Sequence, residues 1–145
     1  MKHCAEEQFT LAVQHAAHAW RRALDRRLRD LGLGRSGWMT ISVIAKAAQP
    51  LSQVEISNFI GVEGATMVTT LDRLEKSGLV ERITHHSDRR IKLVNLTEAG
   101  HSLHEKLREA ADAARDELLH GLEREEMIIA TRLLEKMRDM ADKIR

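Results

Sequence analysis

The chain is poor in the features that mark several classes of protein. Its 145 residues include one cysteine, one proline and only 3% aromatic residues. A single cysteine cannot form an intramolecular disulfide, which excludes a disulfide-stapled fold and favours a reducing, cytoplasmic location. No apolar run approaches the roughly 18 residues of a membrane span. Glu6 and Glu7 stand where a signal peptide has its apolar stretch.

An excess of charge of one sign is also missing. The formal net charge is +1, so the global balance gives no evidence for a nucleic-acid partner. The sequence has no nucleophile elbow, phosphate-binding loop or paired metal motif. We therefore expect that the protein is not an enzyme and that it has no metal site or resident cofactor.

What the sequence does contain is apolar residues at helical spacing. With 43% hydrophobic and 31% charged residues, its composition is typical of a globular protein. Apolar residues recur every three or four positions from Phe9 to Leu31, which predicts a long amphipathic helix. A second helix is expected from about Ser36 to Ala48, because Pro50 disfavours helix at the residue before it.

The middle of the chain has the signals of two short helices. Ser52 and Glu55 have the spacing of a capping box, and Gly61 is expected to end the helix that starts there. A further helix is predicted over residues 63–77. Two such helices joined by a glycine turn are typical of a helix-turn-helix. The apolar residues expected to face inward from the second helix are Val68, Leu71 and Leu74.

A β-hairpin is predicted directly after these helices. Residues 79–83 and 91–96 are rich in Val, Ile and Leu and are bounded by polar residues. A helix-turn-helix followed by a hairpin is a winged helix. Thr97 is expected to cap a long helix that ends near Leu119, and a last helix is predicted from about Glu123 to Ile144.

The expected fold is therefore mainly α-helical with a small β-hairpin. We divide it into N-terminal helices over residues 1–48, a winged helix-turn-helix over 49–97 and C-terminal helices over 98–145. Each long helix has an apolar stripe, and we expect that one elongated chain does not cover all of these stripes alone. The terminal helices are therefore expected to pair with those of a second subunit.

The helix over residues 63–77 has the chemistry of a DNA-reading helix. Threonine hydroxyls can bond phosphates or bases, a threonine methyl can contact the methyl of thymine, and arginine can pair with guanine. The alternative is an ordinary solvated helix face. The candidate DNA-binding residues of this helix are Thr66, Thr69, Thr70, Arg73 and Lys76. Ser52 and Gln53, at the start of the preceding helix, are further candidates.

The tip of the predicted hairpin reads THHSDRRIK, residues 84–92. Arginines on a hairpin beside a groove-bound helix can enter the minor groove, so Arg89 and Arg90 are candidate DNA contacts. His85 and His86 are candidates for phosphate contact. Asp88 would repel phosphate; it could instead cap the turn or hold a neighbouring arginine. The alternative for the whole stretch is a solvated turn.

Residues 51–100 resemble the DNA-binding core of the MarR family of bacterial transcriptional regulators, and especially its SlyA-like branch. The family pattern is a short helix, a helix ending Leu-x-x-Leu-x-x-x-Gly-Leu-Val, a wing with Asp-x-Arg, and a closing Val-x-Leu-Thr-x-x-Gly. The residues that match it are Leu71, Leu74, Gly78, Leu79, Val80, Asp88, Arg90, Val94, Leu96, Thr97 and Gly100.

The resemblance implies a homodimer that regulates transcription, as a repressor or anti-silencer, by binding a pseudo-palindromic operator in double-stranded DNA. In the family, the second arginine of the wing motif enters the minor groove and the aspartate steadies the wing, which implies these roles for Arg90 and Asp88. The chain departs from the family at Gly64–Ala65, where many members have proline. It also has Thr69 where SlyA-like members often have arginine.

Family members commonly bind small aromatic carboxylates or phenolic compounds, and such an effector is expected to release the DNA. Tryptophans near arginines could stack on and neutralise an aromatic acid. The candidate effector-binding residues are His15, Trp20, Arg21 and Trp38. The alternative is that both tryptophans are ordinary core residues.

Other sensing chemistries and one other class of protein stay open. Cys4 could be a redox switch, although its place at the start of the chain favours an inert thiol. The pairs His15/His18 and His101/His104 have helical spacing and could suggest a metal sensor. A helical interaction protein without a DNA role would explain the terminal helices but not the wing.

Overall fold

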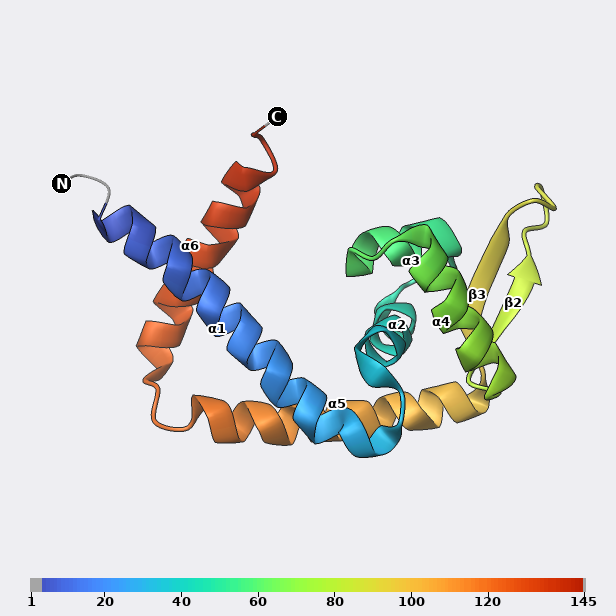
Figure 1. Cartoon of the computed structure of the whole chain (residues 1–145), viewed down its shortest axis with the longest axis horizontal. Helices are drawn as coiled ribbons and strands as arrows, with labels where there is room; N and C mark the ends of the chain where they lie inside the picture. The colour runs from blue at the N-terminus through green and yellow to red at the C-terminus, as the bar shows by residue number, and fades with distance from the viewer. Residues whose placement is uncertain (1–3, 145) are drawn as a thin grey trace. The chain divides into compact units, whose positions relative to one another are not determined.

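The computed structural model describes residues 4–144, which form two compact units: one ends at Ala114 and the other begins at Arg115. No helix among these residues is long and apolar enough to cross a membrane. In chain order the elements (Figure 1) are α1 (Cys4–Leu28), the 3-10 turn η1 (Arg29–Leu31), α2 (Gly34–Lys46), β1 (Leu51–Ser52), α3 (Gln53–Ile60), α4 (Gly64–Lys76), β2 (Val80–Thr84), β3 (Lys92–Leu96), α5 (Glu98–Leu119) and α6 (Arg124–Ala141).

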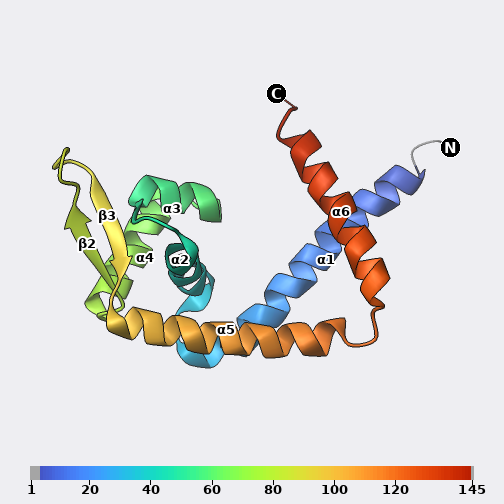
Figure 2. The same ribbon diagram turned by 180° about the vertical axis from the view of Figure 1, so that it is seen from behind.

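The first unit contains a winged helix, as the sequence predicts. Helices α2, α3 and α4 lie beside the sheet, and the β2–β3 hairpin projects as a wing next to α4; Figure 2 shows the same arrangement from behind. The prediction of a two-stranded hairpin is incomplete. The sheet has a third strand, β1, and the antiparallel order is β1-β3-β2. Leu51 pairs with Val94 and Ser52 with Leu93.

The core of the first unit lies where these elements meet. Its largest fully buried apolar side chains come from α2, α3, α4 and both long strands, so the helix-turn-helix and the wing share one core. Leu107 of α5 joins the same cluster. These fully buried apolar residues are Ile41, Ile56, Met67, Leu71, Leu74, Val80 and Val94.

Helix α3 is fixed at both ends by the signals seen in the sequence. The Ser52 hydroxyl accepts from the Glu55 amide at 3.3 Å, and the Glu55 carboxylate accepts from the Ser52 amide at 2.7 Å. The hydrogen bonds with Ser52 lower the pKa of Glu55. Gly61 ends the helix with φ 75°, a left-handed conformation that glycine adopts without steric cost. The predicted capping box is confirmed.

The start of α5 is held against the residues that precede β2. The Thr97 hydroxyl donates to the Gly78 carbonyl at 2.6 Å and accepts from the Gly100 amide at 3.1 Å, which confirms the predicted helix cap. A Cβ at Gly100 would collide with the Leu79 carbonyl oxygen. Only glycine therefore allows α5 to approach this backbone so closely.

Three predicted details of the first unit are wrong. The first helix begins earlier than Phe9 and ends at Leu28, since a 3-10 turn and a left-handed Gly32 follow it. The second helix begins at Gly34 and ends at Lys46. Val68 does not face inward: its side chain is 40% exposed, and Met67 occupies the buried position.

The second unit begins at Arg115 and contains the last residues of α5 and the whole of α6. A capping box between Glu123 and Glu126 starts α6, within the predicted range. No residue of α6 is buried. Large apolar side chains lie exposed along α6 and just after it: Ile128, Ile129, Leu133, Leu134, Met140 and Ile144.

Candidate nucleic-acid interface

Helix α4 presents a polar surface that includes most of the predicted contact residues. Thr66, Thr69, Arg73 and Lys76 are exposed. The Arg73 guanidinium also donates to the Leu33 carbonyl at 3.0 Å, so one of its nitrogens is held at the residue before α2. A shallow hollow of about 390 Å³ lies along this surface, lined by Ser36, Ala65, Thr66, Thr69, Thr70 and Arg73.

Thr70 is not on the exposed face, contrary to prediction. Its side chain is 3% exposed, and its hydroxyl lies 3.0 Å from that of Ser36 in α2. Met67, Leu71 and Leu74 are buried with it, since residues three and four apart share one side of a helix. Thr70 therefore joins α4 to α2 at the base of the hollow and is removed from the set of base readers.

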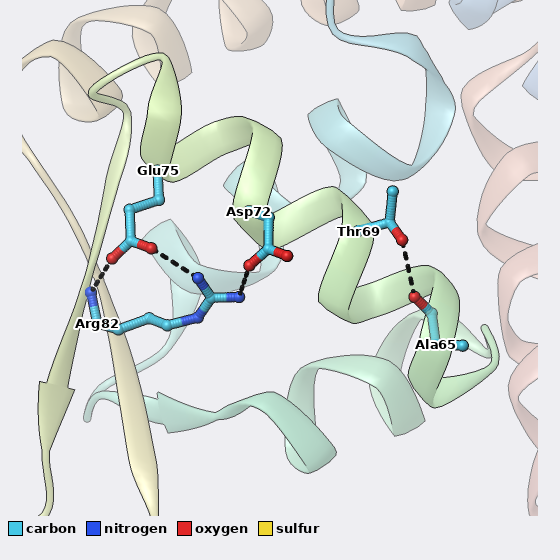
Figure 3. Close-up of polar contacts among 5 residues, drawn as sticks. All are labelled: Ala65, Thr69, Asp72, Glu75 and Arg82. Atoms are coloured by element: carbon cyan, nitrogen blue, oxygen red, sulfur yellow. Dashed lines mark hydrogen bonds and ion pairs between the residues drawn. The ribbon is translucent and has the colours of Figure 1, made fainter.

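Thr69 is exposed and its hydroxyl is partly occupied. It donates to the Ala65 carbonyl at 3.1 Å, one turn earlier in α4 (Figure 3). The hydroxyl oxygen can still accept a hydrogen bond, and the methyl group projects away from Ala65. Toward a ligand, Thr69 therefore presents a methyl group and an acceptor rather than a donor.

At the wing tip, Asp88 caps the turn and also holds Arg90. Its carboxylate accepts from the Arg90 amide at 2.9 Å and from the Arg90 side chain at 3.3 and 3.4 Å. The hydrogen bond to the Arg90 side chain is the main reason that the pKa of Asp88 is lowered. The Arg90 side chain is 92% exposed. Both suggested roles for Asp88 are thus combined in one contact, and Arg90 is available to a partner.

The two wing histidines are stacked on each other, with ring centroids 4.6 Å apart. His85 Nδ1 accepts from the Ser87 amide at 3.2 Å and lies 2.8 Å from its hydroxyl. A neutral His85 therefore carries its proton on Nε2. Arg89, also at the wing tip, is exposed.

Arg82 was not among the residues predicted to form the interface. It lies in β2, and its guanidinium donates to Asp72 and to Glu75 of α4, each at 2.6 Å (Figure 3). Its amide also donates to Glu75 at 3.3 Å. Burial alone would lower the pKa of Arg82, but the hydrogen bonds to Asp72 and Glu75 outweigh it and the pKa is raised. Asp72 and Glu75 are three residues apart on one helix, and Arg82 lies in the strand that follows. This spacing is the only signal in the sequence that could have indicated their contact.

The four predicted effector residues do not line one common hollow. Trp38 donates its indole N–H to Asp25 at 3.2 Å and lines a hollow of about 480 Å³ with Asp25, Leu28, Arg29, Gly34 and Arg35. The Arg35 side chain is paired with the same aspartate. Arg21 lines a second hollow of about 370 Å³, with Arg35, Ser36, Met39, Ile60 and Val62. His15 is exposed and Trp20 half-buried, and neither lines these two hollows.

Comparison with known proteins identifies the family. Residues 35–92 match the MarR family. The chain is also 31% identical to a transcriptional regulator, PA3341, with a TM-score of 0.86 over 94% of this chain and 99% of that one. The chain belongs to the MarR family. Wild-type MarR from E. coli is 26% identical, with a TM-score of 0.78 over 88% of this chain and 94% of that one.

A third solved structure shares the fold at lower identity. CouR from Rhodococcus jostii RHA1, bound to p-coumaroyl-CoA, is 21% identical, with a TM-score of 0.80 over 97% of this chain and 96% of that one. The chain is thus a MarR-family transcriptional regulator by sequence and by fold. Its assignment to the SlyA-like branch stays a prediction.

The alternative sensors of this MarR-family chain rest on Cys4 and on the histidine pairs. Among residues 4–144, no three His, Cys, Asp or Glu side chains are grouped so that they could hold a metal ion. Cys4 is the first residue of α1, inside the helix rather than before it, and its exposed sulfur accepts from the Gln8 side chain at 3.4 Å. Burial lowers the pKa of His104, which favours its neutral form.

Proposed function

We propose that this MarR-family regulator acts as a homodimer that binds a pseudo-palindromic operator in double-stranded DNA. The observation that carries the proposal is Arg90, whose exposed side chain is held at the wing tip by Asp88. An arginine aimed in this way matches the negative potential of a narrow minor groove. The protein would then act in the cytoplasm by binding, as a repressor or anti-silencer, and not as an enzyme.

In the proposed complex, α4 lies in the major groove and the wing reaches the adjacent minor groove. Thr66, Thr69, Arg73 and Lys76 are exposed on α4 and face the bases and phosphates. Ser52 and Gln53 lie at the start of α3, where backbone N–H groups favour a phosphate. Arg89 would support Arg90 on the wing. Dimer symmetry would place two half-sites about one helical turn apart.

Homodimer formation is supported by the apolar surface of α6. No residue of α6 is buried, and large apolar side chains such as Ile129, Leu133 and Met140 are exposed on it. Such an apolar surface is unfavourable in water without a partner. A second copy of the same helix offers a matching apolar surface, and closed twofold symmetry is the commonest arrangement of identical subunits.

The wing contact is tested by Arg90→Ala. Operator affinity should fall by about 10-fold to 100-fold, and the dependence of log affinity on log salt should become shallower because fewer phosphate counterions are released. Fluorescence anisotropy on a duplex selected by the wild-type protein from a randomised library measures both. The dimer should form as before in analytical ultracentrifugation. Unchanged affinity of the variant for the selected duplex would contradict the proposed docking.

An aromatic or phenolic acid is the proposed effector, and the hollow beside Trp38 is its proposed site. Arg29 and the indole of Trp38 offer positive charge and an aromatic face, while Arg35 in the same hollow is paired with Asp25. CouR, which shares the fold, binds a p-coumaroyl thioester. The effector would release DNA by favouring a different separation of the wings.

The effector proposal is tested by titrating hydroxybenzoates and hydroxycinnamates into the protein–DNA complex. At least one should lower operator affinity, and Trp38→Phe, which removes the N–H donor to Asp25, should change its potency. Equal operator affinity with every acid of the series would count against an effector of this class.

A further inference from the structure

The contact between the wing and α4 suggests a role for a residue outside the predicted interface. Arg82 is in the middle of β2, opposite Val94 of β3, and its side chain is only 18% exposed. Its guanidinium is occupied by Asp72 and Glu75 (Figure 3). With both ends of the fork bonded to carboxylates, Arg82 is not placed to contact a phosphate itself.

The two carboxylates are on the side of α4 that faces the wing. The side chains of Asp72 and Glu75 remain 61% and 43% exposed even with Arg82 bound. Thr69 lies one turn before Asp72 on the same exposed surface. If α4 enters a major groove, both carboxylates come close to the phosphates of that groove, and an unpaired negative charge there would repel DNA.

We propose that Arg82 is a positioning residue for DNA binding that acts through Asp72 and Glu75. It bonds to two carboxylates beside the reading surface and offsets one of their two negative charges, and it joins the wing to α4 at two points. A bidentate or bridging guanidinium fixes geometry more strongly than a single ammonium contact, because its donors are held in one plane. The orientation of Arg90 relative to Thr69 then depends on this joint. The inference rests on the proposed function.

The experiment measures the effect of Arg82→Gln in two backgrounds. In the wild-type background the substitution leaves Asp72 and Glu75 uncompensated, and affinity for the selected duplex should fall about tenfold or more. In an Asp72→Asn, Glu75→Gln background no carboxylate is left to compensate, and the amides can still bond to Gln. There the same substitution should change affinity by less than about threefold.

Arg89→Gln is the matched control. Arg89 is also a basic wing residue, but it is exposed and has a proposed contact of its own with DNA. Its removal should cost the same factor in both backgrounds, because it does not act through the α4 carboxylates. The fraction of folded protein at the assay temperature, from circular dichroism, corrects each affinity for any loss of stability.

The outcomes separate the inference from the proposed function. If the wild-type protein selects no duplex, DNA binding itself fails. If the wild-type protein binds and Arg82→Gln has no effect, or costs the same factor in both backgrounds, Arg82 does not act through the carboxylates and the inference is overturned. If Arg82→Gln does not fold, Arg82→Lys replaces it: lysine retains the charge but lacks the planar fork, and its smaller loss should likewise disappear in the neutral background.

Discussion

At Thr69, helix α4 uses the hydroxyl hydrogen for an internal hydrogen bond, which leaves the methyl group and one acceptor oxygen. The bond to the Ala65 carbonyl occupies the only hydrogen that the side chain can donate. A methyl group in a major groove has one specific counterpart, the 5-methyl group of thymine. We therefore expect this position to favour thymine through apolar contact.

The prediction at the residue scale is that Thr69→Val retains operator affinity and thymine preference, whereas Thr69→Ser loses the preference. Deoxyuridine, which lacks the 5-methyl group, is substituted for each operator thymine in turn. At one thymine in each half-site, replacement by deoxyuridine should weaken the binding of the wild-type protein about fourfold. This factor corresponds to roughly 0.8 kcal/mol, the free energy of burying one methyl or methylene group. Fluorescence anisotropy measures each pair, and Thr69→Ala should be insensitive to the same change.

The opposite pattern would show that the hydroxyl is the reading group. In that case Thr69→Val would lose affinity at every base, and Thr69→Ser would behave like the wild type.

Neighbouring residues show how far the sequence determines the site. Asp88 and Arg90 could be predicted because their contact is local: the carboxylate bonds a backbone amide two residues away. Thr70 could not, because its hydroxyl is satisfied by Ser36, 34 positions earlier. Arg82 shares this limit, since its effect depends on how β2 lies against α4. Contacts between residues close in the sequence can be predicted from the sequence, whereas contacts between elements depend on how the chain folds.

At the scale of elements, the joint between α5 and the base of the wing depends on one missing side chain. The Thr97 and Gly100 contacts bring α5 against the backbone of Gly78 and Leu79. The Leu79 carbonyl is also bonded to the Thr97 amide at 3.1 Å, so neither side can move away without losing a hydrogen bond.

Gly100→Ala should therefore destabilise the fold by about 2 kcal/mol or more, because a methyl group must displace packed backbone. The same substitution at Gly64, where nothing lies within 4 Å of an added Cβ, should be neutral or stabilising by up to about 1 kcal/mol, since alanine favours helix. Urea denaturation followed by circular dichroism measures both. Equal effects at the two positions would mean that the approach at Gly100 is not restrictive.

The elements themselves were largely predictable, with one instructive exception. Helices and the two long strands have enough residues to show a period, and caps such as Ser52 and Gly61 mark their ends. Strand β1 has two residues and shows no alternation. Its pairing with β3 exists only because α3 brings Leu51 beside Val94.

At the scale of the whole molecule, the exposed apolar residues of α6 separate assembly from the fold of the winged helix. Ile129→Glu with Leu133→Glu should dissociate the dimer, because two charges would be placed in an apolar contact. The winged helix should remain folded, since its core contains no residue of α6. DNA affinity should fall at least 100-fold, because one half-site is then bound without the other.

Glu135→Lys is the matched control for this prediction. It reverses a charge on the side of α6 where the residues three and four positions away are all polar (Thr131, Arg132, Arg138 and Asp139), and it should leave the dimer intact. Sedimentation equilibrium gives the assembly state and anisotropy gives the DNA affinity. A double variant that stays dimeric would show that the apolar residues of α6 do not form the subunit contact.

The two residues of β1 also bear on how the sequence can vary among related proteins. Leu51 and Ser52 pair with β3 while the Ser52 hydroxyl starts α3. An insertion between them would shift either the strand register or the helix cap, so the length of this segment should be invariant. The exposed residues 48–50, just before it, are free of both constraints. Changes in length between α2 and α3 should therefore gather there, and an alignment of relatives would show a gap-free column pair at positions 51 and 52.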